Sequence, residues 1–307
     1  MKEILLRTEN LSKSFSSGGI LQHVLKNIDL ELYDGDFTVI MGASGAGKST
    51  LLYALSGMDT PTLGTVTFCG TCAGEAGSHG ASRRDAASRV VSSGDAGSHG
   101  ASCRDAASRV APSGDTSSRG SAPHGRIISD LTPDQLAVFR RSFCGFVFQQ
   151  IYLIDGMSVM DNVLAAGLLV NKDRKALVNR ARELFQAVGI LEETQRKFPT
   201  QISGGEAQRV GIVRGLINSP RILFADEPTG ALNSKSGLEV LDTLTRFNRS
   251  GQSVVMVTHD MRSARRGNRI LYLKDGAILG ECLLGKYEHG DEERHNKLSS
   301  FLEQMGW

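Results

Sequence analysis

Residues 42–50 read GASGAGKST, a run of glycines and small residues that ends in a lysine and two hydroxyl side chains. The spacing G-x-x-x-x-G-K-[S/T] predicts a loop whose backbone N–H groups surround a phosphate, provided that a strand precedes it and a helix follows. The apolar run TVIM precedes the loop and a helical pattern begins at Lys48, so both conditions hold. The predicted nucleotide-binding loop consists of Gly42, Ala43, Ser44, Gly45, Ala46, Gly47, Lys48, Ser49 and Thr50.

Two side chains of this loop have chemical roles of their own. The ammonium of Lys48 can reach the β- and γ-phosphate oxygens, and the positive end of the helix dipole favours the same anion. The hydroxyl of Ser49 can bind Mg²⁺. We therefore expect a nucleotide with Mg²⁺, and Lys48 among the catalytic residues.

Further polar residues follow two other apolar runs. Asp226 ends the run RILFAD, where its carboxylate would hold Mg²⁺ through water, and Glu227 comes next. Glu227 suits a general base for the attacking water, although alone it fits a solvent-exposed loop carboxylate equally well. His259 follows SVVMVT and can contact the γ-phosphate, but alone it also fits a hydrogen-bonded core histidine.

Residues 202–209, ISGGEAQR, place a serine and two glycines at the start of another helical pattern. Ser203 is a favourable N-cap, Gly204 and Gly205 allow close approach, and the helix dipole favours an anion. These residues fit a second phosphate site, and they also fit an ordinary helix start.

Short apolar runs alternate with helical patterns, which is typical of an α/β fold with a parallel sheet. Strands are expected over 3–11, 23–34, 36–42, 221–226 and 253–259, and helices over 48–57, 132–141, 158–170, 174–188 and 206–217. Ligands of open α/β folds bind at the carboxyl edge of the sheet, so we expect His259 to lie on the same edge as Asp226 and Glu227.

One segment does not match the rest. Residues 76–95 recur as residues 96–115, with differences only at Arg83/Cys103, Val91/Ala111 and Ser92/Pro112. The composition over 73–125 is mostly Ala, Gly and Ser, without aromatic residues, and buries too little apolar surface to offset its ordering entropy. We expect a single domain over 1–307, interrupted by a disordered surface insertion at about 73–125. An arginine-bearing tether for an acidic partner is the alternative.

Near the C-terminus, an apolar stripe predicts a helix that packs on the domain rather than on a membrane; it consists of Leu298, Phe301, Leu302 and Met305. Five cysteines without an export signal favour reduced thiols. A zinc site is an alternative that the missing second ligand pair disfavours. Its candidate ligands are Cys69, Cys72, His79, His99 and Cys103.

The composition is that of an ordinary globular protein, with 40% hydrophobic and 22% charged residues among 307. The net charge of +2 gives no whole-chain attraction for nucleic acid or an anionic membrane. No uncharged apolar stretch approaches about 18 residues, so we expect a cytosolic chain.

Together these motifs resemble the ATP-binding subunit of ABC transporters. GASGAGKST resembles the Walker A motif, ILFADE the Walker B motif, ISGGEAQR the signature motif, GALN at 230–233 the D-loop and VTHD the switch-histidine region. Gln149, in CGFVFQQ, matches the Q-loop glutamine. Phe15, in SKSFSS, matches an aromatic residue that stacks on adenine, with core packing as the alternative.

The resemblance implies an ATPase with a P-loop core around a parallel sheet, an N-terminal antiparallel β subdomain and a helical signature subdomain. It implies Mg²⁺ bound near Ser49, Gln149 and Asp226, and hydrolysis by Glu227 and His259. In this family two subunits pair head to tail, and the signature residues of one cover the γ-phosphate held by the other. The corresponding residues are Ser203, Gly204, Gly205 and Glu206.

Two motifs depart from the family pattern without losing a catalytic group. Ile202 and Glu206 stand where the usual signature has Leu and Gln, and Asn233 replaces the common D-loop aspartate. Glu206 brings a negative charge near phosphates, which would weaken nucleotide sandwiching modestly or point toward the ribose instead. Hydrolysis is still expected.

The implied partners are a second copy of the chain and a separate membrane permease that docks around 149–161. The implied location is cytoplasmic, on the inner face of the cell membrane. GFVFQQ and ADEPTGALNSKSG resemble the branch that serves antimicrobial-peptide and lipoprotein-type export. An ABC ATPase that drives signalling without cargo is the alternative. A translation or DNA-repair member would normally carry two cassettes or a coiled coil, so no nucleic acid partner is expected.

Deleting residues 73–125 should leave the ATPase activity of the assembled transporter nearly unchanged, because the composition of this segment predicts no contribution to the core. Phosphate release by the full-length and shortened proteins checks this. A large loss of activity would show that the segment is more than a passive insertion.

Overall fold

The computed structural model describes residues 2–70 and 125–307. The predicted insertion at 73–125 therefore lies outside the described residues except for its last position. Four ligands of the zinc alternative, Cys72, His79, His99 and Cys103, lie outside them as well. The cysteines within the described residues, Cys69, Cys144 and Cys282, are free thiols.

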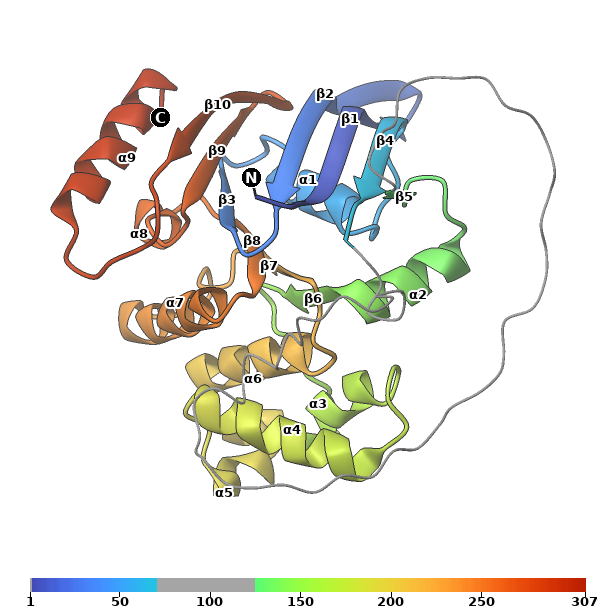
Figure 1. Cartoon of the computed structure of the whole chain (residues 1–307), viewed down its shortest axis with the longest axis vertical. Helices are drawn as coiled ribbons and strands as arrows, with labels where there is room; N and C mark the ends of the chain where they lie inside the picture. Colours follow the sequence, from blue (N-terminus) through green and yellow to red (C-terminus); the bar gives the residue numbers. More distant parts are fainter. Residues whose placement is uncertain (1, 71–124) are drawn as a thin grey trace.

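A six-stranded sheet forms the centre of the fold, in the order β10-β9-β3-β8-β7-β6 (Figure 1). Strands β9, β3, β8, β7 and β6 are parallel, and β10 pairs with β9 in the antiparallel direction. The predicted parallel sheet is confirmed. Its strands are β3 (Phe37–Met41), β6 (Cys144–Val147), β7 (Ile222–Asp226), β8 (Ser253–Val257), β9 (Arg269–Lys274) and β10 (Ala277–Leu283).

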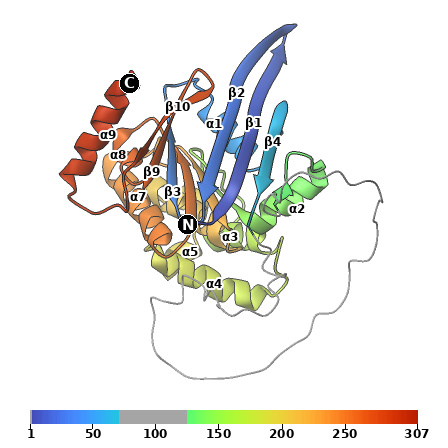
Figure 2. The same ribbon diagram turned by 45° about the horizontal axis from the view of Figure 1, so that its top comes forward.

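An antiparallel sheet in the order β2-β1-β4-β5 stands beside it (Figure 2). The first two N-terminal strands predicted from the sequence are longer than expected and form one hairpin. The short β5 pairs with β4 through Thr67 and Ile127, so the chain returns after residues 71–124 beside the point where it left. The strands are β1 (Ile4–Ser17), β2 (Ile20–Tyr33), β4 (Leu63–Phe68) and β5 (Arg126–Ile127).

Helices cover both faces of the central sheet. The helix α1 (Lys48–Leu55) lies between the two sheets, where Leu51, Leu52 and Leu55 join a core with strands from both. The predicted helical subdomain packs on the opposite side, and Figure 1 shows α3, α4 and α5 beyond α6, away from the antiparallel sheet. Its helices are α3 (Val159–Gly167), α4 (Arg174–Ala187), α5 (Glu192–Gln195) and α6 (Gly204–Leu216), with the short 3₁₀ turn Pro199–Gln201 before α6.

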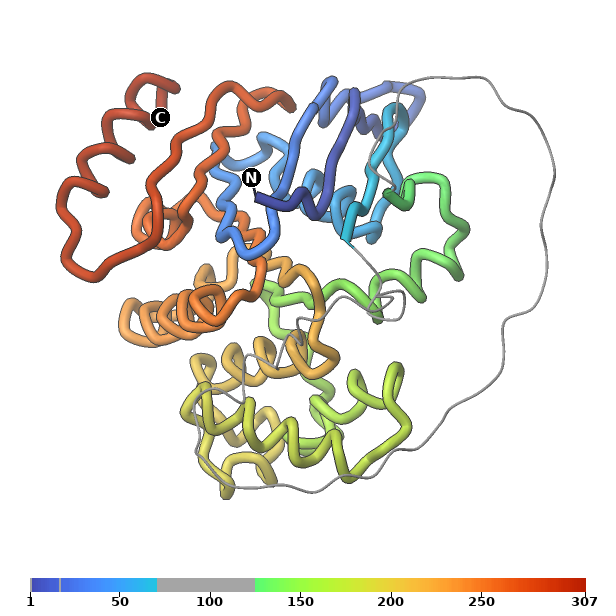
Figure 3. Tube along the Cα trace, in the orientation of Figure 1, coloured from blue at the N-terminus to red at the C-terminus, as the bar shows by residue number. Residues whose placement is uncertain are grey.

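The remaining helices are α2 (Pro133–Phe143), α7 (Ser234–Arg249), α8 (Met261–Ala264) and α9 (Glu292–Gln304). The tube in Figure 3 shows α9, the last helix, beside the C-terminal strands. Leu298 and Leu302 of α9 are fully buried, and Phe301 and Met305 pack against the same core. The predicted packing stripe is therefore confirmed.

Leu298→Ala should lower the free energy of unfolding by about 2–5 kcal/mol, because it removes a fully buried side chain and leaves a cavity. Leu283→Ala is the matched control, since Leu283 is 60% exposed and its truncation should change stability by no more than about 0.5 kcal/mol. Urea unfolding of both variants measures the difference. Equal effects of the two substitutions would contradict this packing of α9.

Candidate active site

The predicted phosphate loop joins β3 to α1 and is open to solvent at Ala43, Ser44 and Gly45. The N-cap of α1 is Gly47, in the left-handed region at φ 99°, and no side chain caps this helix end. The first N–H groups of a helix have no partner within the helix. An uncapped helix start behind an exposed loop therefore presents donors and a positive dipole end to an anion.

The backbone of this loop requires glycine at its first position. A Cβ on Gly42 would lie 2.2 Å from the carbonyl oxygen of Leu273 in β9, and its φ of 156° borders the region that favours glycine. The loop consequently lies directly against the sheet edge, where the ends of the neighbouring strands are within reach.

Lys48 is buried, and its Nζ donates a hydrogen bond of 2.8 Å to the carbonyl oxygen of Ala43 within the loop. Burial lowers the pKa of Lys48, while the charges of Glu227 and Asp226 partly oppose that shift. The ammonium thus faces the loop interior and is under the influence of both carboxylate charges, which fits a group that binds phosphates.

Ser49 and Asp226 meet at the end of β7. The Ser49 hydroxyl donates to Oδ1 of Asp226 at 2.9 Å, and the hydroxyl of Tyr53 donates to Oδ2 at 2.9 Å. A hydroxyl and a carboxylate at the phosphate loop are hard oxygen donors of the kind Mg²⁺ binds, so these residues fit the predicted metal.

Glu227 and His259 also lie together, because β7 and β8 pair in register up to Asp226 and Val257. The Nδ1 atom of His259 is 2.9 Å from Oε1 of Glu227. The histidine side chain is 60% exposed, so it is not the core histidine of the alternative interpretation. Glu227 has φ 44°, a conformation that is rare for a non-glycine residue and is concentrated at functional sites.

The signature residues form a capping box at the start of α6. The Glu206 carboxylate accepts from the Ser203 backbone N–H at 2.9 Å and from the Ser203 hydroxyl at 2.7 Å. These two hydrogen bonds lower the pKa of Glu206. Within the free subunit Glu206 thus turns toward the signature serine, an orientation that the sequence-based alternatives for this residue did not include. Ser203 and Gly204 are exposed.

The other two predicted ligand-binding residues are Phe15 and Gln149. Phe15 is 44% exposed and therefore not part of the core, and Nζ of Lys13 lies 5.0 Å from its ring centroid. Gln149 lies against Gly230, where an added Cβ would come within 2.9 Å of its amide nitrogen. No hydrogen bond among the described residues joins Gln149 to Ser49 or Asp226. Adenine stacking and metal binding by these residues remain predictions.

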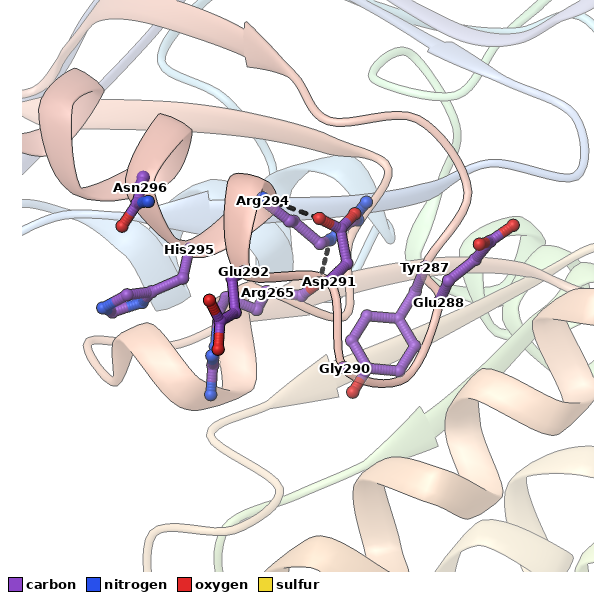
Figure 4. Close-up of a pocket in the computed structure, with 9 residues that line it drawn as sticks. All are labelled: Arg265, Tyr287, Glu288, Gly290, Asp291, Glu292, Arg294, His295 and Asn296. Carbon is purple, nitrogen blue, oxygen red and sulfur yellow. Dashed lines mark hydrogen bonds between the residues drawn. The ribbon is translucent and has the colours of Figure 1, made fainter.

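A separate pocket lies at the start of α9, away from the phosphate loop (Figure 4). Its central Arg294 is buried and donates to backbone carbonyl oxygens of Arg265 and Leu284. This guanidinium ties the C-terminal segment to the domain. The residues that line the pocket include none of the phosphate loop, so the pocket is a separate feature.

The P-loop fold and the residues at the carboxyl edge of its sheet define a nucleotide hydrolase. A family model described as ABC transporter matches residues 25–95 and 117–230. The chain belongs to the ABC transporter family, and it is an ATP-binding and ATP-hydrolysing member of it.

Proteins of known sequence and structure agree with this assignment. The chain is 33% identical over 275 residues to an uncharacterized ABC transporter ATP-binding protein of Methanocaldococcus jannaschii, covering 90% of this chain and 98% of that protein. It is 35% identical over 277 residues to the macrolide export ATP-binding/permease protein MacB of Escherichia coli, covering 90% of this chain. It spans only 34% of the length of MacB.

Among solved structures, a dimeric post-hydrolysis state of the ATP-binding cassette MJ0796 bound to ADP and Pi has a TM-score of 0.69 at 31% identity. The match covers 92% of this chain and 100% of that one.

The structure adds one residue to the site that the sequence analysis missed. Tyr53 contacts Asp226 directly. The available signal was its spacing, since residues four apart on a helix share a face and Ser49 lies four residues before it.

Lys48→Ala should abolish ATP binding, because it removes the buried ammonium that faces the loop interior. Equilibrium binding of a fluorescent ATP analogue measures the effect. Lys26→Ala, at an exposed lysine outside the loop, should bind like the wild type. Unchanged affinity in Lys48→Ala would contradict the phosphate site.

Proposed function

We propose that this chain is the Mg²⁺-dependent ATPase subunit of a membrane exporter and works as a head-to-tail dimer. The proposal rests on one observation. The chain has two helix N-termini suited to an anion, at α1 and at α6, and they belong to different parts of the fold. One, at α1, lies with Lys48, Asp226 and Glu227, whereas the other, at Ser203, faces solvent on a helix that packs mainly on β6, α3, α4 and α7.

We propose a role for each group at the catalytic edge. The loop N–H groups and Lys48 bind the phosphates, and Ser49 and Asp226 are the residues that would hold Mg²⁺. Mg²⁺, when bound, supplies positive charge against the γ-phosphate oxygens. Glu227 accepts a proton from the attacking water, and His259, 2.9 Å from its carboxylate, orients that carboxylate.

The exposed signature turn is explained by a second subunit. Ser203 and Gly204 would cover the γ-phosphate bound by the partner, and the helix dipole of α6 would favour that anion. The solved structure of the MJ0796 cassette is dimeric, which supports the pairing of two copies. In the free subunit the Ser203 hydroxyl donates its hydrogen bond to the Glu206 carboxylate. To bind the partner's phosphate, this hydroxyl must break that hydrogen bond and donate to the phosphate instead.

A membrane partner is supported by an apolar surface beside the predicted docking segment. A groove lies between α2, β6, α3 and α6, and its wall includes Phe148, Tyr152, Leu169 and Arg214. The large apolar side chains of Tyr152, Ile154 and Met157 are exposed to solvent. Neighbouring exposed apolar side chains commonly mark a surface that binds another protein. None of the helices in 2–70 and 125–307 has the length and apolar character that crossing a membrane requires. We infer that a permease covers the groove and holds the chain at the inner face of the membrane.

For the cargo, the likeness to MacB supports export of a macrolide. The motifs GFVFQQ and ADEPTGALNSKSG support a peptide or lipoprotein-type molecule. Efflux by vesicles that contain this chain and its co-purifying membrane protein distinguishes export from a signalling role without cargo.

The proposed head-to-tail dimer can be tested with a variant that binds ATP and does not hydrolyse it. Glu227→Gln should bind ATP with the affinity of the wild type, release no phosphate above background, and dimerise when ATP is added. Adding Gly204→Asp should abolish dimerisation while ATP binding persists. A Cβ at Gly204 meets only Leu232 Cδ2, at 3.5 Å, and an acidic residue at a helix start is favourable, so the monomer tolerates the change.

Light scattering during size-exclusion chromatography measures the mass of each variant. Gly156→Asp in the same background is the matched control, because Gly156 has open space around it and lies outside the signature turn. Phosphate release by Glu227→Gln at the wild-type rate would remove Glu227 as the base. ATP-dependent dimers that survive Gly204→Asp would contradict the head-to-tail arrangement.

A further inference from the structure

We propose that Tyr53 is a positioning residue for the Mg²⁺ site, acting through the carboxylate of Asp226. The inference deepens the proposed Mg²⁺-dependent hydrolysis and depends on it. It assigns a second task to α1, which already provides the phosphate-binding N–H groups.

The geometry of the Asp226 carboxylate carries the inference. Ser49 and Tyr53 lie one turn apart on α1, so both hydroxyls project from the same face of the helix. The Ser49 hydroxyl donates to Oδ1 and the Tyr53 hydroxyl donates to Oδ2, each at 2.9 Å. Two donors from one rigid helix therefore fix the rotation of a carboxylate that belongs to the neighbouring strand β7.

The two hydrogen bonds have different fates when a metal binds. Ser49 is itself a predicted metal ligand, so its hydroxyl would turn toward the ion. Tyr53 is not a predicted ligand, so its hydroxyl would keep its hydrogen bond to Oδ2 and would hold the Asp226 carboxylate in place for the ion. Carboxylates that bind metals are commonly oriented by such outer hydrogen bonds, and their loss typically weakens metal affinity by about 10–100-fold.

The surroundings of Tyr53 suit this role. Its ring is half-buried against the core between the two sheets, and its backbone carbonyl accepts from Met58 N–H at 2.9 Å. The ring therefore anchors the hydroxyl in place.

Tyr53→Phe isolates the hydroxyl because it keeps the ring. Tyr33→Phe is the matched control, since Tyr33 also donates to a carboxylate, Glu31 Oε2, at 2.9 Å, on β2 and outside the catalytic edge. The full-length proteins are titrated with Mn²⁺ in the presence of ADP, and bound Mn²⁺ is measured by electron paramagnetic resonance. ADP affinity is measured separately in EDTA.

We expect Tyr53→Phe to bind Mn²⁺ about tenfold more weakly than the wild type, with ADP affinity in EDTA and thermal stability unchanged. The Mg²⁺ concentration that half-saturates ATPase activity should rise by a similar factor. Tyr33→Phe should match the wild type in each measurement.

Equal Mn²⁺ affinity in Tyr53→Phe and wild type would overturn the inference and leave the proposed function intact. A loss of ADP affinity in EDTA as large as the loss of Mn²⁺ affinity would also overturn it, because the hydroxyl would then support the fold of the loop. Failure of the wild type to bind Mn²⁺ with ADP would overturn the proposed metal site itself.

Discussion

The pairing of three parallel strands is the constraint on which the site depends. Backbone hydrogen bonds hold β3, β8 and β7 side by side, with Val257 paired to Ile40 on one side and to Asp226 on the other. The pairing continues just past the strands, where Thr258 N–H donates to the carbonyl oxygen of Ile40 and Glu227 N–H donates to that of Val257. A slip by one residue would reverse the side chains of a strand and separate the phosphate loop from the carboxylates.

The sequence predicted the parts of the fold that have strong local signals. The phosphate loop, the apolar strands before Asp226 and His259, and the stripe on α9 all follow from spacing and periodicity. The strands β4, β5, β6, β9 and β10 and the helices α5, α7 and α8 were not predicted. Of these, β5 has two residues and β6 four, which is too short for a clear alternation, and β10 is only partly buried.

The site was predictable where one residue has one chemical role, and less so where two side chains must meet. His259 and Glu227 were expected at the same sheet edge, but their direct contact at 2.9 Å depends on the register of β7 and β8. Glu206 was expected to face a nucleotide, whereas its nearest donors within the chain belong to Ser203. Such local hydrogen bonds form within one chain because they require no partner subunit.

The pairing of β4 with β5 bears on how well the fold accepts inserted sequence between these two strands. Phe68 lies opposite Arg126, so the chain enters and leaves this point of the sheet at neighbouring positions. Closing a flexible loop between fixed ends costs only about 0.6 kcal/mol more for each doubling of its length. The β4–β5 connection is therefore a suitable place to graft foreign sequence, such as an epitope or a reporter domain, without displacing the nucleotide site.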